Sequence, residues 1–110
     1  MSYKKGKKRT AEIMSVREAK EVFGIFEGIE GMYTMDNEPV LNKYDQQLHT
    51  ISLVNPETGE IQKYWADGGI RGAVKLAKIK KGEPIVIKHT GEKEIDEGVV
   101  QTYDIFEATL

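Results

Sequence analysis

The sequence predicts a single all-β domain of five strands, with one short helix between the third and the fourth strand. Five runs of β-branched and aromatic residues predict the strands, turn-forming residues separate them, and one stretch shows helical periodicity instead. The chain has 110 residues, of which 39% are hydrophobic and 31% are charged. This length and composition are typical of one soluble globular domain with a single core.

The clearest predicted element is a β-hairpin over residues 48–66. Its strand-forming residues are Thr50, Ile51, Leu53 and Val54 in the first run, and Ile61, Tyr64 and Trp65 in the second. Pro56 and Gly59 lie between the two runs, and a tight turn favours a proline early and a glycine late. The hairpin supplies the second and third strands.

A long, bent first strand is predicted ahead of this hairpin. Residues 19–31 form an apolar run that Gly24 and Gly28 interrupt, and glycine inside a strand pattern indicates a bulge or a sharp bend. Residues 32–47 are rich in Asp, Asn and Pro, so they predict a long, exposed connection between the first two strands.

The first ten residues are basic and contain too little apolar surface to order themselves, so they predict a flexible arm. Its cations are Lys4, Lys5, Lys7, Lys8 and Arg9, which either contact phosphates or only keep the terminus solvated. Residues 11–21 fit either a brief helix capped by Ser15 or an irregular lead-in. We therefore expect the arm and lead-in over residues 1–18 and the folded domain over residues 19–110.

After the hairpin, the spacing of the apolar residues changes from every second residue, as in a strand, to every third or fourth residue, as in a helix. Asp67 can cap a helix of about ten residues, which Gly82 and Pro84 then end. The helix is indicated by the spacing of Ile70, Ala73, Val74 and Ala77. Residues 84–90 predict the fourth strand, residues 91–98 an acidic loop, and residues 99–108 the fifth strand.

This order of elements is that of the five-stranded oligonucleotide/oligosaccharide-binding (OB) fold, a partly open Greek-key barrel, with the helix between strands three and four. Three segments carry a further resemblance: YWADGG at 64–69, KKGEPIVIKHTGEK at 80–93 and VVQTYDIFEA at 99–108. In this pattern of strands and intervening turn residues, residues 22–108 resemble the single-stranded-DNA-binding proteins of tailed bacteriophages and prophages.

The resemblance implies a protein that binds single-stranded DNA, largely without sequence preference, in phage DNA replication or recombination in the cytoplasm of a bacterial host. Many such proteins end in an acidic tail that recruits other replication proteins, whereas this chain ends in Phe106, Glu107, Ala108, Thr109 and Leu110. A cluster of acidic residues lies instead in the predicted loop at 91–98, where it disfavours contact with a polyanion. Its members are Glu92, Glu94, Asp96 and Glu97. Binding to other replication or recombination proteins and formation of a homodimer stay open.

Binding of unpaired strands needs aromatic faces for the bases and cations for the phosphates. The candidate residues are Tyr33, Lys43, Tyr44, Lys63, Tyr64, Trp65 and Lys88. Alternation along the third strand places Tyr64 on one face and both Lys63 and Trp65 on the other. Either Trp65 points into the core, or Tyr64 does and Trp65 then lies beside Lys63 on the outer face.

The remaining aromatic and cationic residues have simpler interpretations. Phe23, Phe26 and Phe106 are expected mainly in the core, because burial of a phenylalanine contributes about 1.5 to 3 kcal/mol. Arg71, Lys75 and Lys78 are expected on the solvent face of the helix. Tyr33 and Tyr44 either present their rings to a ligand or are covered by their own connection.

The sequence does not favour an enzyme or a cofactor. It contains no cysteine, and its only two histidines, His49 and His89, lack the spacing of a metal site. No apolar run reaches the roughly 20 residues of a membrane-spanning helix. The net charge of −2 favours an alternative, an OB-fold module for protein interaction or assembly that uses a sheet edge or the acidic loop and does not bind nucleic acid.

Overall fold

The computed structural model describes residues 12–110, so the flexible arm expected over residues 1–10 lies outside the described part. The elements are α1 (Val16–Ala19), β1 (Glu21–Gly31), β2 (His49–Val54), β3 (Ile61–Trp65), α2 (Gly68–Ala77), β4 (Pro84–Ile95) and β5 (Gly98–Glu107). The five strands form one antiparallel sheet in the order β3-β2-β1-β4-β5. The predicted all-β class with α2 between the third and fourth strands is therefore confirmed.

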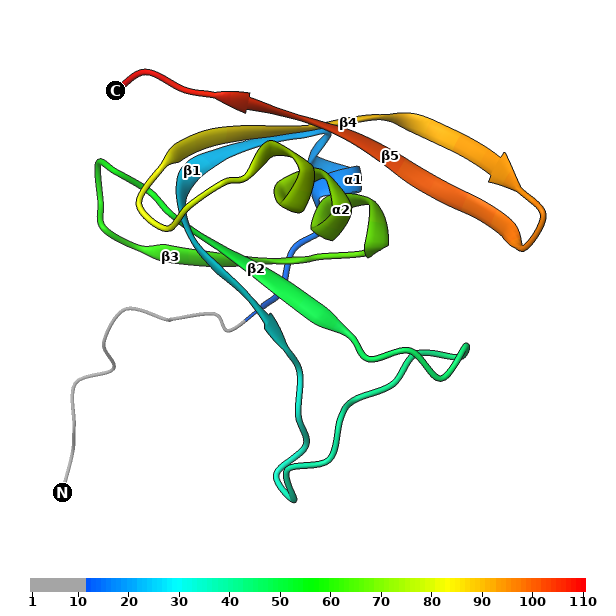
Figure 1. Cartoon of the computed structure of the whole chain (residues 1–110). Helices are drawn as coiled ribbons and strands as arrows, with labels where there is room; N and C mark the ends of the chain where they lie inside the picture. Colours follow the sequence, from blue (N-terminus) through cyan, green and yellow to red (C-terminus); the bar gives the residue numbers. More distant parts are fainter. Residues whose placement is uncertain (1–11) are drawn as a thin grey trace, which may run out of the picture.

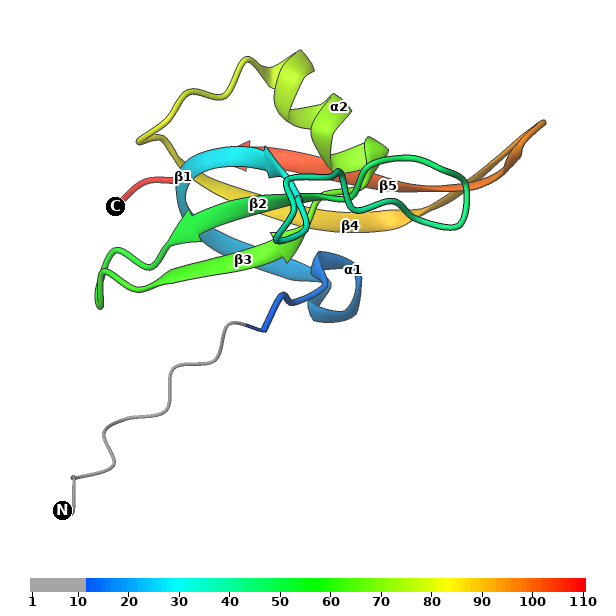
Figure 2. The same ribbon diagram turned by 90° about the horizontal axis from the view of Figure 1, so that it is seen from below.

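The sheet is strongly curled but does not close (Figure 1). Its two edge strands are β3 and β5, and no strand pairing joins them. The two helices lie on opposite sides of the strands (Figure 2). The structure thus shows an open, curled five-stranded sheet, with a helix covering it on each side.

The bend of β1 arises at a bulge, as the sequence predicts. The register with β2 steps from the pair Phe26 and Leu53 to the pair Gly28 and Ser52, so Glu27 has no partner of its own. Gly28 has a φ of 136°, which side chains with a Cβ rarely adopt. The bulge lets β1 pair with β4 along its first half and with β2 along its second half.

The core lies between the inner face of the curled sheet and the two helices. Its fully buried side chains are Ile51, Leu53, Ile85 and Ile87 from the strands, and Val16 and Ile70 from the helices. Phe26 also belongs to this core, with 7% of its surface exposed. The prediction that Phe23 and Phe106 are core residues is wrong, since they are 45% and 49% exposed.

The folded part of the chain includes the segment just before β1. Met14 forms a parallel bridge to Tyr64, with hydrogen bonds from Met14 N to Lys63 O (3.0 Å) and from Trp65 N to Met14 O (2.9 Å). Val16, in α1, is only 1% exposed. Of the two interpretations of this segment, the structure shows the brief helix, and Ser15 accepts a hydrogen bond from the amide of Glu18 (3.2 Å).

The prediction of an acidic loop over residues 91–98 is wrong. β4 continues to Ile95 and β5 begins at Gly98, so only Asp96 and Glu97 form the turn. Glu92 and Glu94 lie on β4, where Glu92 accepts a hydrogen bond from Gln101 of β5 (3.2 Å). This long β4–β5 hairpin extends beyond the rest of the sheet (Figures 1 and 2).

α2 begins at a cap that also ties it to β5. One carboxylate oxygen of Asp67 accepts a hydrogen bond from the amide of Ile70 (2.9 Å), and the other accepts one from the hydroxyl of Tyr103 (2.8 Å). The predicted ten-residue helix is confirmed, although it ends at Lys78 in the left-handed conformation rather than at Gly82. Asp67 therefore fixes both the start of α2 and its position on the sheet.

Stability should decrease at alkaline pH because of Tyr103. Burial, and then the hydrogen bond to Asp67, raise the pKa of Tyr103 above the ordinary tyrosine value of 10.0. The folded protein keeps this phenol protonated where the unfolded chain ionises it, so its contribution is complete below about pH 10 and is lost as the pH rises further. Urea unfolding at about pH 8 and about pH 11 should show this loss.

Two variants show whether Tyr103 is the cause. Tyr103→Phe has no phenol to ionise at this position, so its stability should fall less between the two pH values than that of the unchanged protein. Tyr33→Phe is the control, because the Tyr33 side chain is 60% exposed and its replacement should leave the pH dependence as it is. An equal loss in all three proteins would contradict the assignment to Tyr103.

Candidate nucleic-acid interface

β3 presents Lys63 and Trp65 on the outer face of the sheet. Tyr64 points the opposite way and packs against the core, where burial raises the pKa of its hydroxyl. Ile51 and Tyr64 are directly paired across β2 and β3, which places Tyr64 on the same side as buried Ile51. Of the two arrangements that alternation allows, the structure has the one with Trp65 outward, so the Tyr64 ring is not on the outer face.

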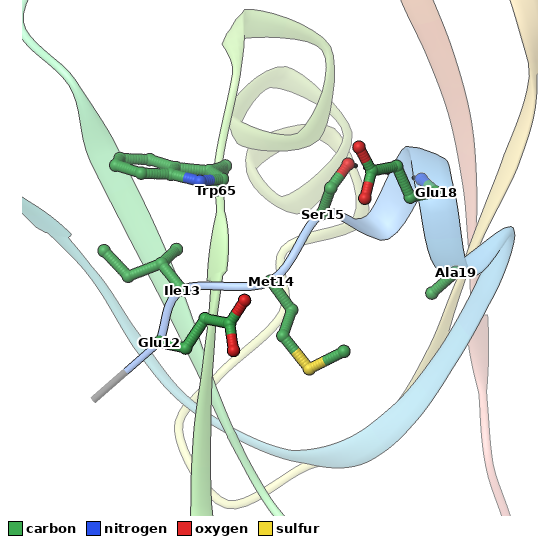
Figure 3. A pocket seen from close by; sticks show the side chains of 7 residues that line it. All are labelled: Glu12, Ile13, Met14, Ser15, Glu18, Ala19 and Trp65. Atoms are coloured by element: carbon green, nitrogen blue, oxygen red, sulfur yellow. Dashed lines mark hydrogen bonds between the residues drawn. The ribbon is translucent and has the colours of Figure 1, made fainter. Parts of the chain in front are cut away.

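The indole of Trp65 borders a hollow formed with the segment before β1. This hollow, of about 550 Å³, is lined by Trp65 together with Glu12, Ile13, Met14, Ser15, Glu18 and Ala19 (Figure 3). The carboxylates of Glu12 and Glu18 make this side of Trp65 unfavourable for a phosphate. Trp65 itself remains 37% exposed.

A second, smaller pocket lies next to Trp65, between the β1–β2 connection and the start of α2. It has a volume of about 180 Å³, and its lining includes Trp65, Arg71 and His49, with Asn42 and Gln46 from the connection. Gln47 and Asp67 also line it, so the pocket combines an aromatic ring, a guanidinium and an imidazole with three side-chain amides and one carboxylate. These groups can stack on a base, pair with a phosphate and form hydrogen bonds with base edges.

Arg71 is held in this pocket by the corner between β3 and α2. Its Nη1 donates a hydrogen bond to the carbonyl oxygen of Ala66 (3.1 Å) and lies 2.9 Å from Nδ1 of His49. Nδ1 of His49 is also 3.0 Å from the carbonyl oxygen of Gln47. An unprotonated Nδ1 accepts a hydrogen bond from Arg71, whereas a protonated Nδ1 donates one to Gln47. The two contacts therefore belong to different tautomers of His49.

The expectation that Arg71 lies on the solvent face of α2 is therefore wrong, because its side chain is partly buried against Ala66 and His49. Neither Arg71 nor His49 was predicted from the sequence as a site residue. One signal was present: Arg71 is four residues after the cap Asp67, and a helical side chain leans toward the preceding turn. That direction brings the guanidinium back over the end of β3.

The β1–β2 connection presents its two tyrosines to solvent. Tyr33 is 60% exposed and Tyr44 is 68% exposed, so neither ring is covered by the connection. Nζ of Lys43 lies 5.1 Å from the centre of the Tyr44 ring, within the range of a cation–π contact. Asn42 orders this turn by accepting hydrogen bonds from the amides of Tyr44 (2.8 Å) and Gln46 (3.1 Å).

Lys88 lies apart from the Trp65 pockets. It is exposed on β4, with Glu21 of β1 and Asp104 of β5 directly opposite on the two neighbouring strands. The predicted site residues thus occupy three places: Lys63 and Trp65 together on β3, Tyr33, Lys43 and Tyr44 on the connection, and Lys88 alone on β4. The connection reaches Trp65 through Asn42 and Gln46, which line the same pocket.

Residues 12–110 contain no group of three or more histidine, aspartate or glutamate side chains that could hold a metal ion. No helix within the same residues has the length and apolar character needed to cross a membrane. The chain matches no protein-family model, no curated protein and no solved structure.

Proposed function

We propose that this protein is an OB-fold protein that binds single-stranded DNA, largely without sequence preference, in phage DNA replication or recombination. The observation that carries the proposal is the outward Trp65 beside Lys63 on β3, next to a pocket that Arg71 also lines. A ring for stacking and cations for the phosphates are the two requirements for binding unpaired strands.

The arrangement of the sheet supports the OB-fold part of the proposal. The fold is a partly open five-stranded barrel whose β2–β3 face and loops β1–β2 and β4–β5 bind oligonucleotides. Here Trp65 and Lys63 lie on β3, and the long β1–β2 connection displays Tyr33 and Tyr44. These four candidate residues therefore lie on the elements by which OB folds bind a strand, whereas Lys88 lies on β4.

Local charge favours one side of Trp65 for the strand. Glu12 and Glu18 line the larger hollow, and no cation from the described residues lines it with them. In the smaller pocket the one carboxylate, Asp67, accepts hydrogen bonds from Ile70 N and the Tyr103 hydroxyl, and the guanidinium of Arg71 lines the same pocket. A phosphate next to a base stacked on Trp65 is repelled by the first pair and attracted by Arg71. We infer that the strand crosses β3 on the side of α2 and the β1–β2 connection.

Trp65→Ala should weaken binding of fluorescein-labelled oligo-dT by about fivefold to 150-fold, because loss of one stacking contact costs about 1 to 3 kcal/mol. Trp65→Phe retains an aromatic face and should lose much less. Ile61→Ala, at an exposed position of the same strand face, is the control and should bind almost as the unchanged protein does. Fluorescence anisotropy at fixed salt measures all four affinities.

Circular dichroism of each variant shows whether the fold is kept. Equal affinities for Trp65→Ala and the unchanged protein would contradict the role of Trp65. A loss in Trp65→Phe as large as that in Trp65→Ala would also contradict stacking, because only the indole, and not aromatic character, would then matter.

A second candidate function is protein interaction or assembly on the same sheet. It is favoured by an exposed apolar row: Phe23, Val86 and Phe106 are directly opposite one another on β1, β4 and β5. Both phenylalanines are about half exposed, and the net charge of the chain is −2. Saturable, salt-sensitive binding of oligo-dT is expected only of the first function.

A further inference from the structure

We infer that a cationic pocket between α1, the start of β1 and β4 is a binding site for a phosphate group. The pocket has a volume of about 520 Å³ and is lined by Arg17, Lys20, Glu21, Lys88, His89, Thr90 and Gly91. Three cations and one carboxylate thus border a concave surface built from segments distant in the sequence. This inference rests on the proposed function in one respect, that the phosphate belongs to the bound strand.

Within residues 12–110, the three cations of this pocket, Arg17, Lys20 and Lys88, form no ion pair. Two carboxylates, Glu21 and Asp104, nevertheless lie directly opposite Lys88 on the neighbouring strands. Glu21 is the only carboxylate in the lining, so the lining has a formal charge of +2, and Asp104 beside Lys88 lowers the charge of the whole group to +1. A dianionic or monoanionic phosphate is the ligand class that such a concave cluster attracts. The Thr90 hydroxyl lies 2.8 Å from the Thr102 hydroxyl, and it donates to a phosphate in the arrangement in which it accepts from Thr102.

His89 forms one wall of the pocket, and two neighbouring side chains fix the orientation of its ring. Its Nε2 lies 2.7 Å from Oε1 of Gln101 and donates a hydrogen bond to it, which leaves Nδ1 without a protein partner within residues 12–110. The ring also packs edge-on against Tyr103, with 5.4 Å between the two ring centres. The wall of the pocket next to the cations is therefore rigid, since His89 is fixed by both Gln101 and Tyr103.

Lys20 is held in an unusual backbone conformation at the rim of this pocket. Its φ of 69° and ψ of −41° lie near the strained γ-turn, a region that glycine adopts far more readily than lysine. Hydrogen bonds from Lys20 N to Val16 O and from His89 N to Lys20 O, both 2.8 Å, keep it there. The position therefore has a cation where a glycine would fold with less strain.

α1 separates this pocket from the hollow beside Trp65. Glu18 and Ala19 of α1 line the Trp65 hollow, whereas Arg17 and the following Lys20 line the cationic pocket. Opposite charges thus lie on the two sides of one helical turn. The strand crosses β3 on the α2 side of Trp65, away from Glu12 and Glu18, and its flanking nucleotides then meet Arg17, Lys20 and Lys88 beyond α1. This path gives Lys88 a place in the site.

The strain at Lys20 provides a variant that removes the cation without harming the fold. Lys20→Gly relieves the positive φ, so it should fold at least as well as the unchanged protein. Lys78→Gly is the matched control, because Lys78 also has a positive φ (54°) and is exposed at the end of α2, outside the pocket. Both variants change a lysine at positive φ into glycine, and only one of them changes the pocket.

The test has two arms. In the first, titration with inorganic phosphate followed by NMR should shift the backbone amides of Arg17, Lys20, Lys88 and His89, with smaller shifts in Lys20→Gly and unchanged shifts in Lys78→Gly. In the second, the logarithm of oligo-dT affinity is plotted against the logarithm of salt concentration. Its slope should become shallower by about 0.7 in Lys20→Gly and stay the same in Lys78→Gly.

The two arms separate this inference from the proposed function. If phosphate leaves the four amides unshifted, the phosphate site is contradicted even if oligo-dT binds. If oligo-dT does not bind the unchanged protein, the proposed function fails, and the phosphate titration still decides the site. If oligo-dT binds with the same salt slope in both variants, the strand does not use this pocket and the inference is overturned.

Discussion

Ile51→Ala is expected to lower the free energy of unfolding by about 2 to 5 kcal/mol, because it leaves a cavity at the centre of the core. Ile51 is fully buried on β2, and its direct neighbour Tyr64 packs against the same core. For a single domain of this size, such a loss is a large part of the total stability. Urea unfolding followed by circular dichroism measures it.

Ile61→Ala removes the same atoms from the adjacent strand and is the matched control. Ile61 is 61% exposed, so its truncation should cost less than about 1 kcal/mol. The difference between the two variants reports which face of the β2–β3 hairpin lies in the core. If Ile61→Ala were the more damaging change, the inner and outer faces would be reversed, and Trp65 would no longer be on the outer face.

Gly69→Ala should destabilise the protein by about 1 to 3 kcal/mol through overpacking. A Cβ at this position would overlap the carbonyl oxygen of Gln101 and press on the ring of Tyr103, both on β5. The oxygen of Gln101 is backbone held in the β4–β5 pairing, so it cannot move aside as a flexible side chain can. The close approach of α2 to β5 therefore requires a glycine at position 69.

Gly72→Ala, one turn further along α2, is the control for this prediction. A Cβ there meets nothing within 4 Å, and alanine in a helix interior is more stable than glycine by about 0.5 to 1 kcal/mol. The two substitutions should therefore change stability in opposite directions, which chemical unfolding measures directly. Stabilisation by both would show that α2 does not pack on β5 as described.

The elements of the fold were predictable because their signals are local. Pro56 and Gly59 mark the hairpin turn and Asp67 marks the start of α2, and each acts within a few residues of itself. The extension of β4 was missed because Glu92 and Glu94 are poor strand formers whose pairing with β5 is decided by the hairpin as a whole. Composition alone cannot show such pairing.

The faces of the strands were not predictable to the same degree. Alternation divides β3 into two sets of residues, but the pairing of Tyr64 with buried Ile51 decides which set is inside. The run VFGIF at 22–26 is apolar on both faces, so only the sheet shows that Phe26 is buried and Phe23 is exposed. Arg71 was assigned to solvent because nothing in the sequence places the end of β3 beside it.

The most direct test of the proposed function is quenching of the fluorescence of Trp65, the only tryptophan in the chain, by oligo-dT at two salt concentrations. Stacking on Trp65 predicts a saturable quench whose affinity falls with salt, by a slope of about 0.7 for each phosphate contact. Absence of quenching at low salt, or a quench whose affinity does not depend on salt, would contradict binding of a single strand at this face.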